Sequence, residues 1–267
     1  MQGEKHVGIA GAGLVGSLWA LYLAQRGYEV DVYEGRPDMR QMTAKGGRSI
    51  NLALSDRGWR ALNRINMKHK VEDMGIPMYG RMVHDENGST QFRPYGTDEN
   101  QAIYSVSRAN LNRLLMDEAE AHNGVNLYFD QKAEQAKLSE KRMTFTDRAS
   151  GQQYTAQYDT LFGTDGAFSK VRESMIKTKR FNYSQSYLDH AYKELTIPAD
   201  SQGQHQLYKN ALHIWPRNSF MLIALPNPDG SFTCTLFLAF EGNPAFEQLE
   251  TEADIHQFFD EYFPDAK

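Results

Sequence analysis

A glycine-rich segment near the N-terminus constrains the fold of this chain more than any other feature. A short apolar strand is followed directly by the sequence Gly11-x-Gly13-x-x-Gly16. Apolar residues at helical spacing predict a helix over residues 14–26, after which a second strand leads to Glu34. A strand, a glycine turn, a helix and a second strand in this order predict an α/β unit.

Each position in this segment has a physical role. Gly11 allows a tight turn, Gly13 has no side chain to block a pyrophosphate, and Gly16 lets the helix pack closely on the sheet. The free N–H groups and the positive dipole end of the helix would face the phosphates. Glu34 lies 18 residues after Gly16, where a carboxylate can accept hydrogen bonds from ribose hydroxyls. The segment therefore predicts a dinucleotide site, and the alternative is a tight turn without a ligand.

The composition excludes several classes of protein. The 267 residues are enough for one large or two smaller domains, and a net charge of −5 argues against a nucleic-acid binder. Cys234 is the single cysteine, which excludes disulfides within the chain and suits a reducing compartment such as the cytoplasm. No apolar run approaches the roughly 18 residues of a membrane span.

A second region has the alternating pattern of β-strands. Residues 78–93 change to a period of two, with a hairpin turn at Glu86-Asn87-Gly88. We therefore predict a discontinuous nucleotide domain and an adjacent antiparallel sheet domain, with boundaries at 1–76 and 97–180 for the first and 77–96 and 181–267 for the second. Strands of the second domain are expected at 191–197, 211–215, 220–225 and 232–240.

Further turns and helix starts lie between these regions. Ser55 is predicted to cap a helix over residues 56–65, and Ser107 a helix that runs to about residue 122. A hairpin is expected over residues 143–158. Asp165-Gly166 follows another apolar strand and precedes a helix, and nucleotide folds place ligand contacts at such strand ends.

These features resemble the FAD-dependent aromatic hydroxylases of the class A flavoprotein monooxygenase type. The resemblance implies a Rossmann-like FAD-binding domain with an antiparallel β-sheet substrate domain beside it. Longer stretches resemble in particular the members that hydroxylate L-kynurenine: Gly47-Arg-Ser-Ile-Asn-Leu-Ala-Leu-Ser55, Gly80-Arg-Met82, Pro94-Tyr-Gly-Thr97, Ser105-Val-Ser-Arg108, His213-Ile-Trp-Pro-Arg217 and Phe232-Thr-Cys-Thr-Leu-Phe237.

The resemblance assigns cofactor contacts along the chain. It implies that the FAD pyrophosphate is held by Gly11, Gly13, Val15 and Gly16. It implies an adenosine site made by Tyr33, Glu34, Gly35 and Arg36. Flavin cofactor contacts are implied for Ala53 and Arg108, and a backbone contact for Ala133. Asp165-Gly166 would touch both FAD and the incoming NADPH.

The same resemblance implies that Arg81 and Tyr95 grip the carboxylate of the substrate. A guanidinium group can form two parallel hydrogen bonds with a carboxylate, and a phenol adds a third donor. The alternatives are an exposed ion pair for Arg81 and a turn aromatic for Tyr95. Arg48, directly after Gly46-Gly47, is a further candidate near the flavin. His213 and Trp215, in an apolar strand, are expected in the core.

The implied reaction is hydroxylation of L-kynurenine to 3-hydroxykynurenine with NADPH and O2 through a flavin hydroperoxide. The cofactor carries this chemistry, so no side chain is predicted to be catalytic and no metal site is expected. One alternative is a related monooxygenase that acts on another aromatic acid. Another is a non-catalytic nucleotide-binding module or an inactive fragment that binds FAD.

One departure from the family pattern stands out. The family has a second Gly-Asp dipeptide downstream that contacts FAD, and this chain contains no such dipeptide. We therefore expect the chain to be the N-terminal part of a longer enzyme. Membrane attachment of that longer chain stays open, as does the oligomeric state.

Overall fold

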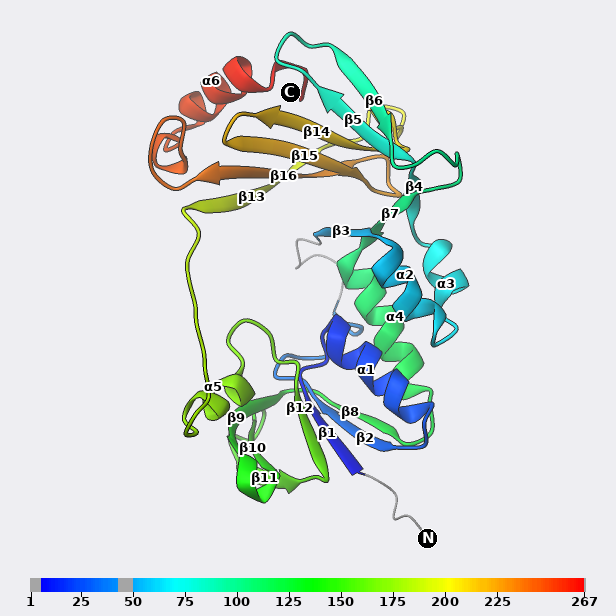
Figure 1. Ribbon diagram of the computed structural model, residues 1–267, viewed down its shortest axis with the longest axis vertical. Coiled ribbons are helices and arrows are strands. Elements are labelled where there is room, and N and C mark those ends of the chain that lie inside the picture. Colours follow the sequence, from blue (N-terminus) through cyan, green and yellow to red (C-terminus); the bar gives the residue numbers. More distant parts are fainter. Residues whose placement is uncertain (1–5, 43–49, 267) are drawn as a thin grey trace. The chain divides into compact units, whose positions relative to one another are not determined.

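The computed structural model describes residues 6–42 and 50–266, and these form two compact units (Figure 1). Unit 1 contains residues 6–42 and 108–185, and unit 2 contains residues 50–107 and 186–266. Both units are therefore discontinuous in sequence. Each is built around its own sheets and is treated separately below.

Unit 1 contains a four-stranded parallel sheet in the order β12-β1-β2-β8. Helices α1 (Leu14–Ala24) and α4 (Arg108–Glu120) run side by side (Figure 1). This arrangement confirms the predicted α/β fold, and it places the glycine turn where β1 ends. The strands are β1 (His6–Ala10), β2 (Glu29–Tyr33), β8 (Val125–Tyr128) and β12 (Thr160–Gly163).

A second, antiparallel sheet completes unit 1 in the order β11-β10-β9. It packs with the end of β2 and with α5 (Lys170–Ile176) around a core that includes Phe145 and Tyr158. The hairpin of β10 and β11 was predicted, but β9 was not, because its sequence is mostly polar. The strands are β9 (Gln131–Lys137), β10 (Arg142–Asp147) and β11 (Gln153–Gln157), with a 3₁₀ turn, η1, at Leu138–Glu140.

Unit 2 contains a six-stranded sheet in the order β13-β16-β15-β14-β5-β6. The prediction of a purely antiparallel sheet is wrong at one place, because β14 and β5 are parallel. The predicted hairpin therefore joins the sheet through a parallel pair. The strands are β5 (Gly80–His84), β6 (Thr90–Pro94), β13 (His190–Ile197), β14 (Ala211–Arg217), β15 (Phe220–Pro226) and β16 (Phe232–Ala239).

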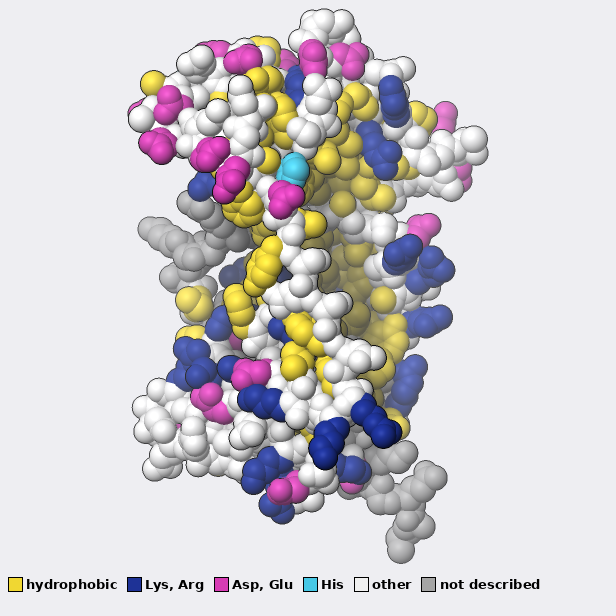
Figure 2. Space-filling view, turned by 60° about the vertical axis from the view of Figure 1, so that its left-hand side comes forward, with side chains coloured by type: hydrophobic (Ala, Val, Ile, Leu, Met, Phe, Trp, Pro, Cys, Tyr) yellow, Lys and Arg dark blue, Asp and Glu magenta, His cyan; other side chains and the backbone are white. Residues whose placement is uncertain are grey.

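The two faces of this sheet differ in burial. Residues on one face, such as Trp215 and Leu222, are buried together with residues of α6 (Glu252–Tyr262) and of the following 3₁₀ turn, η3 (Pro264–Ala266). Another 3₁₀ turn, η2 (Phe246–Gln248), precedes α6. Most residues on the other face, such as Leu212, Ile214 and Ile223, alternate with them and are half-buried or exposed, whereas Leu225 and Thr233 near its end are buried. In the space-filling view, hydrophobic side chains show at the surface over the strands of this unit (Figure 2).

A three-stranded antiparallel sheet, β3-β7-β4, also belongs to unit 2. Residues 50–76 and 97–107 therefore lie in unit 2, whereas we predicted them in the nucleotide domain. The reason is that β3 (Asn51–Leu54), β4 (Ile76–Met78) and β7 (Ile103–Ser107) pair with one another, with helices α2 (Asp56–Asn63) and α3 (Lys68–Glu72) between β3 and β4 in sequence. Among the described residues, no helix is long and apolar enough to cross a membrane.

Candidate sites at the glycine turn and on the six-stranded sheet

The glycine turn has the backbone geometry that its sequence predicts. Gly11 has a φ of 98°, which favours glycine. A Cβ on Gly16 would lie 1.9 Å from the carbonyl oxygen of Gly11, so only glycine lets α1 start this close to the strand. A Cβ on Gly13 would meet no atom within 4 Å. The space that Gly13 leaves open is therefore available to a ligand.

The N-terminus of α1 presents free amides beside this space. The first backbone hydrogen bond of the helix runs from Ser17 N–H to Gly13 O at 3.0 Å. Within the described part of the chain, the N–H groups of residues 13–16 make no hydrogen bond. The side chain of Val15 is 65% exposed in the first turn. Free amides at a helix N-terminus suit an anion such as a diphosphate.

Glu34 is held beside the same turn. Its Oε2 accepts from the Ala12 N–H at 3.0 Å, and its Oε1 accepts from Arg36 N–H at 3.1 Å and from Arg36 Nε at 2.8 Å. Glu34 is only 8% exposed, whereas the Arg36 side chain is 72% exposed. The carboxylate contributes most to raising the pKa of Arg36. Since a carboxylate has about four acceptor sites, Oε2 keeps one for a ribose hydroxyl.

The two residues flanking Glu34 have different surroundings. The Tyr33 ring lies in the core, stacked on Phe145 at 4.0 Å, and its hydroxyl accepts from Tyr158 at 2.6 Å. Burial raises the pKa of Tyr33 strongly. A cofactor contact by the Tyr33 side chain would therefore require this core to open. The backbone of Tyr33 borders the glycine turn, because its carbonyl oxygen accepts a hydrogen bond from the Gly11 N–H. A Cβ on Gly35 would lie 3.6 Å from the Cα of Lys132 on β9, which is ordinary van der Waals contact.

Asp165 anchors the second turn. Its Oδ1 accepts from Ser169 Oγ at 2.5 Å, and its Oδ2 accepts from Lys170 N–H at 2.6 Å, so its carboxylate is bonded to the start of α5. Thr164 donates through Oγ1 to Gly11 O at 2.7 Å, which ties this turn to the glycine turn. Gly166 has a φ of 78° and open space around it. The backbone beyond Asp165, more than its carboxylate, is left to meet a ligand.

The remaining predicted cofactor residues are dispersed. Ala53 is exposed on β3 of unit 2, whereas Arg108 is exposed at the start of α4 in unit 1. Ala133 is half-buried on β9, opposite Phe145. Their cofactor contacts stay predictions. Arg48 lies outside the described residues.

Arg81 and Tyr95 are brought together in unit 2. The Arg81 guanidinium carbon lies 5.3 Å from the centroid of the Tyr95 ring. The Tyr95 hydroxyl is buried and, among the described residues, has no hydrogen-bond partner. Burial raises the pKa of Tyr95, although the Arg81 guanidinium group opposes that change, and the phenol is therefore a protonated donor. A cation and an unused O–H donor side by side suit a carboxylate ligand.

An apolar surface adjoins this pair. Arg81 is in register with Leu212, and Val83 is in register with Ile214, which in turn faces Ile223. These apolar side chains are half-buried and lie on the same face of the sheet as Arg81. The face therefore combines an exposed guanidinium group with an apolar surface, an arrangement that suits a ligand with one anionic and one apolar end.

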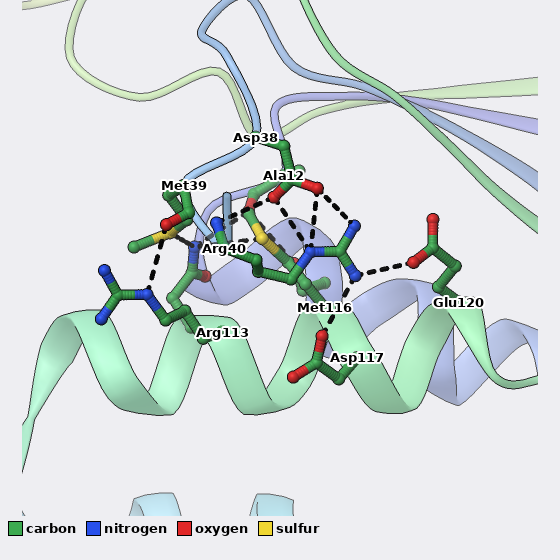
Figure 3. Close-up of polar contacts among 10 residues, drawn as sticks. Ala12, Asp38, Met39, Arg40, Arg113, Met116, Asp117 and Glu120 are labelled. Carbon is green, nitrogen blue, oxygen red and sulfur yellow. Dashed lines mark hydrogen bonds and ion pairs between the residues drawn. The ribbon is translucent and has the colours of Figure 1, made fainter. Parts of the chain in front are cut away.

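Sequence analysis missed a set of contacts made by α4. Asn112 Nδ2 donates to Ala12 O at 3.2 Å and contacts Met39 Sδ, also at 3.2 Å. Arg113 Nε donates to Met39 O, and Arg40 bonds to three carboxylates (Figure 3), those of Asp38, Asp117 and Glu120. Bonding to Asp38 contributes most to raising the pKa of Arg40. No local motif marks the contacts of α4, because its partners Ala12, Met39 and Arg40 are 73 to 100 positions away in sequence.

A buried polar network on the other face of the six-stranded sheet was also missed. His84 Nδ1 lies 2.6 Å from Asp265 Oδ2, and His84 Nε2 lies 2.8 Å from His213 Nδ1. Trp215 Nε1 donates to Asp265 Oδ2 at 2.9 Å, and Arg217 donates to the carbonyl of His84. His213 and Trp215 are buried as predicted. In the part of the chain that is described, no group of three or more His, Cys, Asp or Glu residues could hold a metal ion.

Comparison with known proteins identifies the family. The model of the family described as FAD binding domain matches residues 4–262. The chain belongs to this family. FAD is therefore the cofactor of this family.

Curated relatives share much of the sequence. The chain is 46% identical to a kynurenine 3-monooxygenase of Christiangramia forsetii over 267 residues, which is 100% of this chain and 59% of the relative. It is 47% identical to a kynurenine 3-monooxygenase of Myxococcus xanthus over 98% of this chain and 56% of that relative. It is 47% identical to the enzyme of the same name from Dictyostelium discoideum, with the same coverage. The chain thus spans between half and two thirds of their length.

Solved structures confirm the fold. The tetrameric form of 2-methyl-3-hydroxypyridine-5-carboxylic acid oxygenase matches with a TM-score of 0.71 at 20% identity, over 99% of this chain and 67% of that one. A variant of Klebsiella pneumoniae HpxO, solved in complex with FAD, matches with a TM-score of 0.74 at 18% identity, over 98% of this chain and 65% of that one. The predicted hydroxylase-like architecture is therefore confirmed.

The residues of unit 1 fit the FAD cofactor. The open space at Gly13 and the free amides of residues 13–16 suit the pyrophosphate. The remaining acceptor site on Glu34 suits a ribose hydroxyl. The assignments of individual residues to the cofactor, from Gly11 to Asp165, stay predictions.

Proposed function

We propose that the whole protein is an FAD-dependent monooxygenase that hydroxylates L-kynurenine to 3-hydroxykynurenine with NADPH and O2. The proposal rests first on the kynurenine 3-monooxygenases that share 46–47% of their matched residues with this chain. It extends to the whole protein because the chain spans only part of those relatives. The single buried cysteine suits a reducing compartment, and we propose the cytoplasm.

The pairing of Arg81 with Tyr95 is the structural observation that supports this proposal most directly. L-kynurenine is an amino acid with an aromatic side chain, so its recognition requires a carboxylate site beside an apolar surface. Arg81 offers the guanidinium group, and the buried hydroxyl of Tyr95 offers a further donor without a partner in the described residues. The apolar residues in register with Arg81 offer the surface for the ring.

The protein's contribution to this chemistry is binding, orientation and exclusion of water. A bound flavin would supply the reaction with oxygen by which the aromatic ring is hydroxylated. The amides of residues 13–16 and the carboxylate of Glu34 would hold the adenosine diphosphate half of FAD. Arg81 and Tyr95 would fix one end of the substrate, so that the sheet orients its ring. No side chain is needed as a nucleophile or general base.

A decisive experiment measures the flavin, the binding of substrate and the product in the purified protein. We expect bound FAD in the absorbance spectrum, NADPH oxidation that L-kynurenine stimulates, and 3-hydroxykynurenine by mass spectrometry. Arg81→Leu should weaken L-kynurenine binding at least thirtyfold, because it removes a charged partner of the carboxylate worth about 2 kcal/mol or more.

Arg93→Leu is the matched control, since Arg93 faces Arg81 across the β5–β6 pair but bonds to Gln91. It should bind L-kynurenine within about twofold of the unchanged protein. Equal binding by both variants would favour another aromatic acid as substrate. A protein without flavin would contradict the proposal as a whole.

A further inference from the structure

The carbonyl group of Ala12, inside the glycine turn, is fixed by two side chains. It accepts a hydrogen bond from Ser17 Oγ at 3.1 Å and another from Asn112 Nδ2 at 3.2 Å. Ser17 is fully buried on α1, and Asn112 is 5% exposed on α4. Both donors therefore hold this carbonyl toward the interior of unit 1, between the two helices.

Fixing this carbonyl also fixes the direction of the next amide. The peptide bond is planar and trans, so the C=O of Ala12 and the N–H of Gly13 point in opposite directions. With the carbonyl held toward α1 and α4, the Gly13 N–H is directed away from them. That N–H makes no hydrogen bond within the described residues, and the space beside Gly13 is open. The two side chains therefore set the direction of an amide that faces the ligand space.

The surroundings of Asn112 argue against a role in stability alone. Its Oδ1 is buried and has no hydrogen-bond partner among the described residues, and its Nδ2 otherwise meets only the sulfur atoms of Met39 and Met116. An unpaired buried acceptor destabilises a fold, and an apolar side chain of similar size would avoid that cost. The presence of an asparagine at position 112 is therefore best explained by the hydrogen bond that its side-chain amide donates to Ala12 O.

Helix α4 is well placed to hold Asn112 still. Arg113, the next residue, donates to Met39 O, and Arg40 binds Asp117 and Glu120 of α4 at 3.1 and 2.7 Å (Figure 3). These contacts tie α4 to the segment that follows Glu34. The helix thus contacts both chain segments that border the cofactor site, the glycine turn through Asn112 and the segment after β2 through Arg113.

We propose that Asn112 is a positioning residue for the diphosphate of the cofactor, and that it acts by orienting the Gly13 N–H together with Ser17. The inference rests on FAD binding at the glycine turn. Asn112 itself does not need to touch the cofactor, because its effect passes through the Ala12–Gly13 peptide.

The test is a titration of the flavin-free protein with FAD and with ADP, which carries the same diphosphate without the flavin. Asn112→Leu should weaken the binding of both ligands by about fivefold, which corresponds to one hydrogen bond of ordinary strength. Ser17→Ala should weaken them in the same direction. The free energy of unfolding in urea is measured for each variant to separate affinity from stability.

Ser174→Ala is the matched control. Ser174 is a buried serine of unit 1 that donates to Lys170 O and accepts from Ala136 N–H, away from the glycine turn. It should lower stability while leaving the affinity for both ligands within twofold. If Asn112→Leu does not fold, Ser17→Ala decides the question by the same comparison with Ser174→Ala.

The two proposals fail in different ways. If the unchanged protein binds neither FAD nor ADP, FAD binding by this chain fails, and this inference falls with it. If the unchanged protein binds both and Asn112→Leu binds them equally well, only the role of Asn112 is overturned. Weaker FAD binding with unchanged ADP binding would also overturn it, because the effect would not lie at the diphosphate.

Discussion

The glycine turn of unit 1 and the buried polar network of unit 2 are built in contrasting ways. The three glycines of the turn lie within six residues, and Glu34, whose carboxylate lies beside the turn, follows 18 residues after Gly16. In the network, His84 bonds to Asp265 across 181 positions and to His213 across 129. The turn depends on local backbone geometry, whereas the network depends on the register of a sheet. The first can be predicted from spacing, and the second becomes visible only when the strands are paired.

The largest expected effect tests the local side of this comparison. Gly16→Ala would place a Cβ at 1.9 Å from Gly11 O, which is a backbone atom and cannot move aside as a side chain would. Helix α1 would have to shift away from the turn, so we expect a loss of at least about 3 kcal/mol in the free energy of unfolding. Urea denaturation of the two proteins measures it.

Gly13→Ala is the control within the same turn. Gly13 has a φ of −70° and a ψ of −175°, which any residue adopts, and its Cβ would meet open space. Stability should stay within about 0.5 kcal/mol, while FAD affinity should fall at least tenfold because the methyl group occupies the diphosphate's place. Equal stability losses in both variants would contradict the distinction drawn between the two glycines.

The second prediction tests the network through its pH dependence. Burial lowers the pKa of His213 to about 4, and burial also lowers the pKa of His84, although the Asp265 carboxylate opposes that change. The charge of Arg217 lowers the pKa of His84 further. In the unfolded chain His213 takes up a proton near pH 6.5, but in the folded chain only near pH 4. Stability should therefore fall as the pH decreases from 6.5 toward 4, by up to about 1.4 kcal/mol per pH unit for this group.

Urea denaturation at several pH values measures this slope. His213→Gln should reduce the slope between pH 6.5 and 5, since the titrating group is removed. His69→Gln is the control, because the side chain of His69 is 93% exposed and should leave the slope unchanged. A slope that survives in His213→Gln would show that other groups govern the acid side of the stability profile.

The smallest expected effect concerns two helix N-caps in unit 2. Ser55 precedes α2 as predicted, but its side chain accepts no capping hydrogen bond. Thr251 Oγ1 accepts from Asp254 N–H at 3.2 Å at the start of α6, and Asp254 bonds back to Thr251. Thr251→Ala should therefore cost about 1 kcal/mol of stability, and Ser55→Ala less than about 0.3 kcal/mol. Thermal or urea denaturation measures the stability lost in each variant. Equal losses would show that the type of residue at the N-cap sets the stability, whether or not its side chain accepts a hydrogen bond.

The candidate cofactor site of unit 1 could be predicted from the sequence to a large extent. The strand, the glycine turn, the helix and Glu34 all follow from local spacing, and the structure places each of them at the same turn. The pairing of Arg81 with Tyr95 followed from a resemblance to known enzymes, not from spacing. The boundary of unit 2 was predicted too narrowly, because β3 and β7 pair across about fifty residues of sequence.

The sequence by itself determined that this chain has a parallel α/β unit with a tight glycine turn at the end of its first strand, because those properties depend on backbone conformations that few residue types allow. Only the tertiary structure decided that β14 and β5 are parallel, that the ring of Tyr33 lies in the core, and that Asn112 reaches Ala12. Each of these three features depends on which distant segments of the chain pack against one another. A local sequence pattern cannot predict that packing, because it depends on the whole chain.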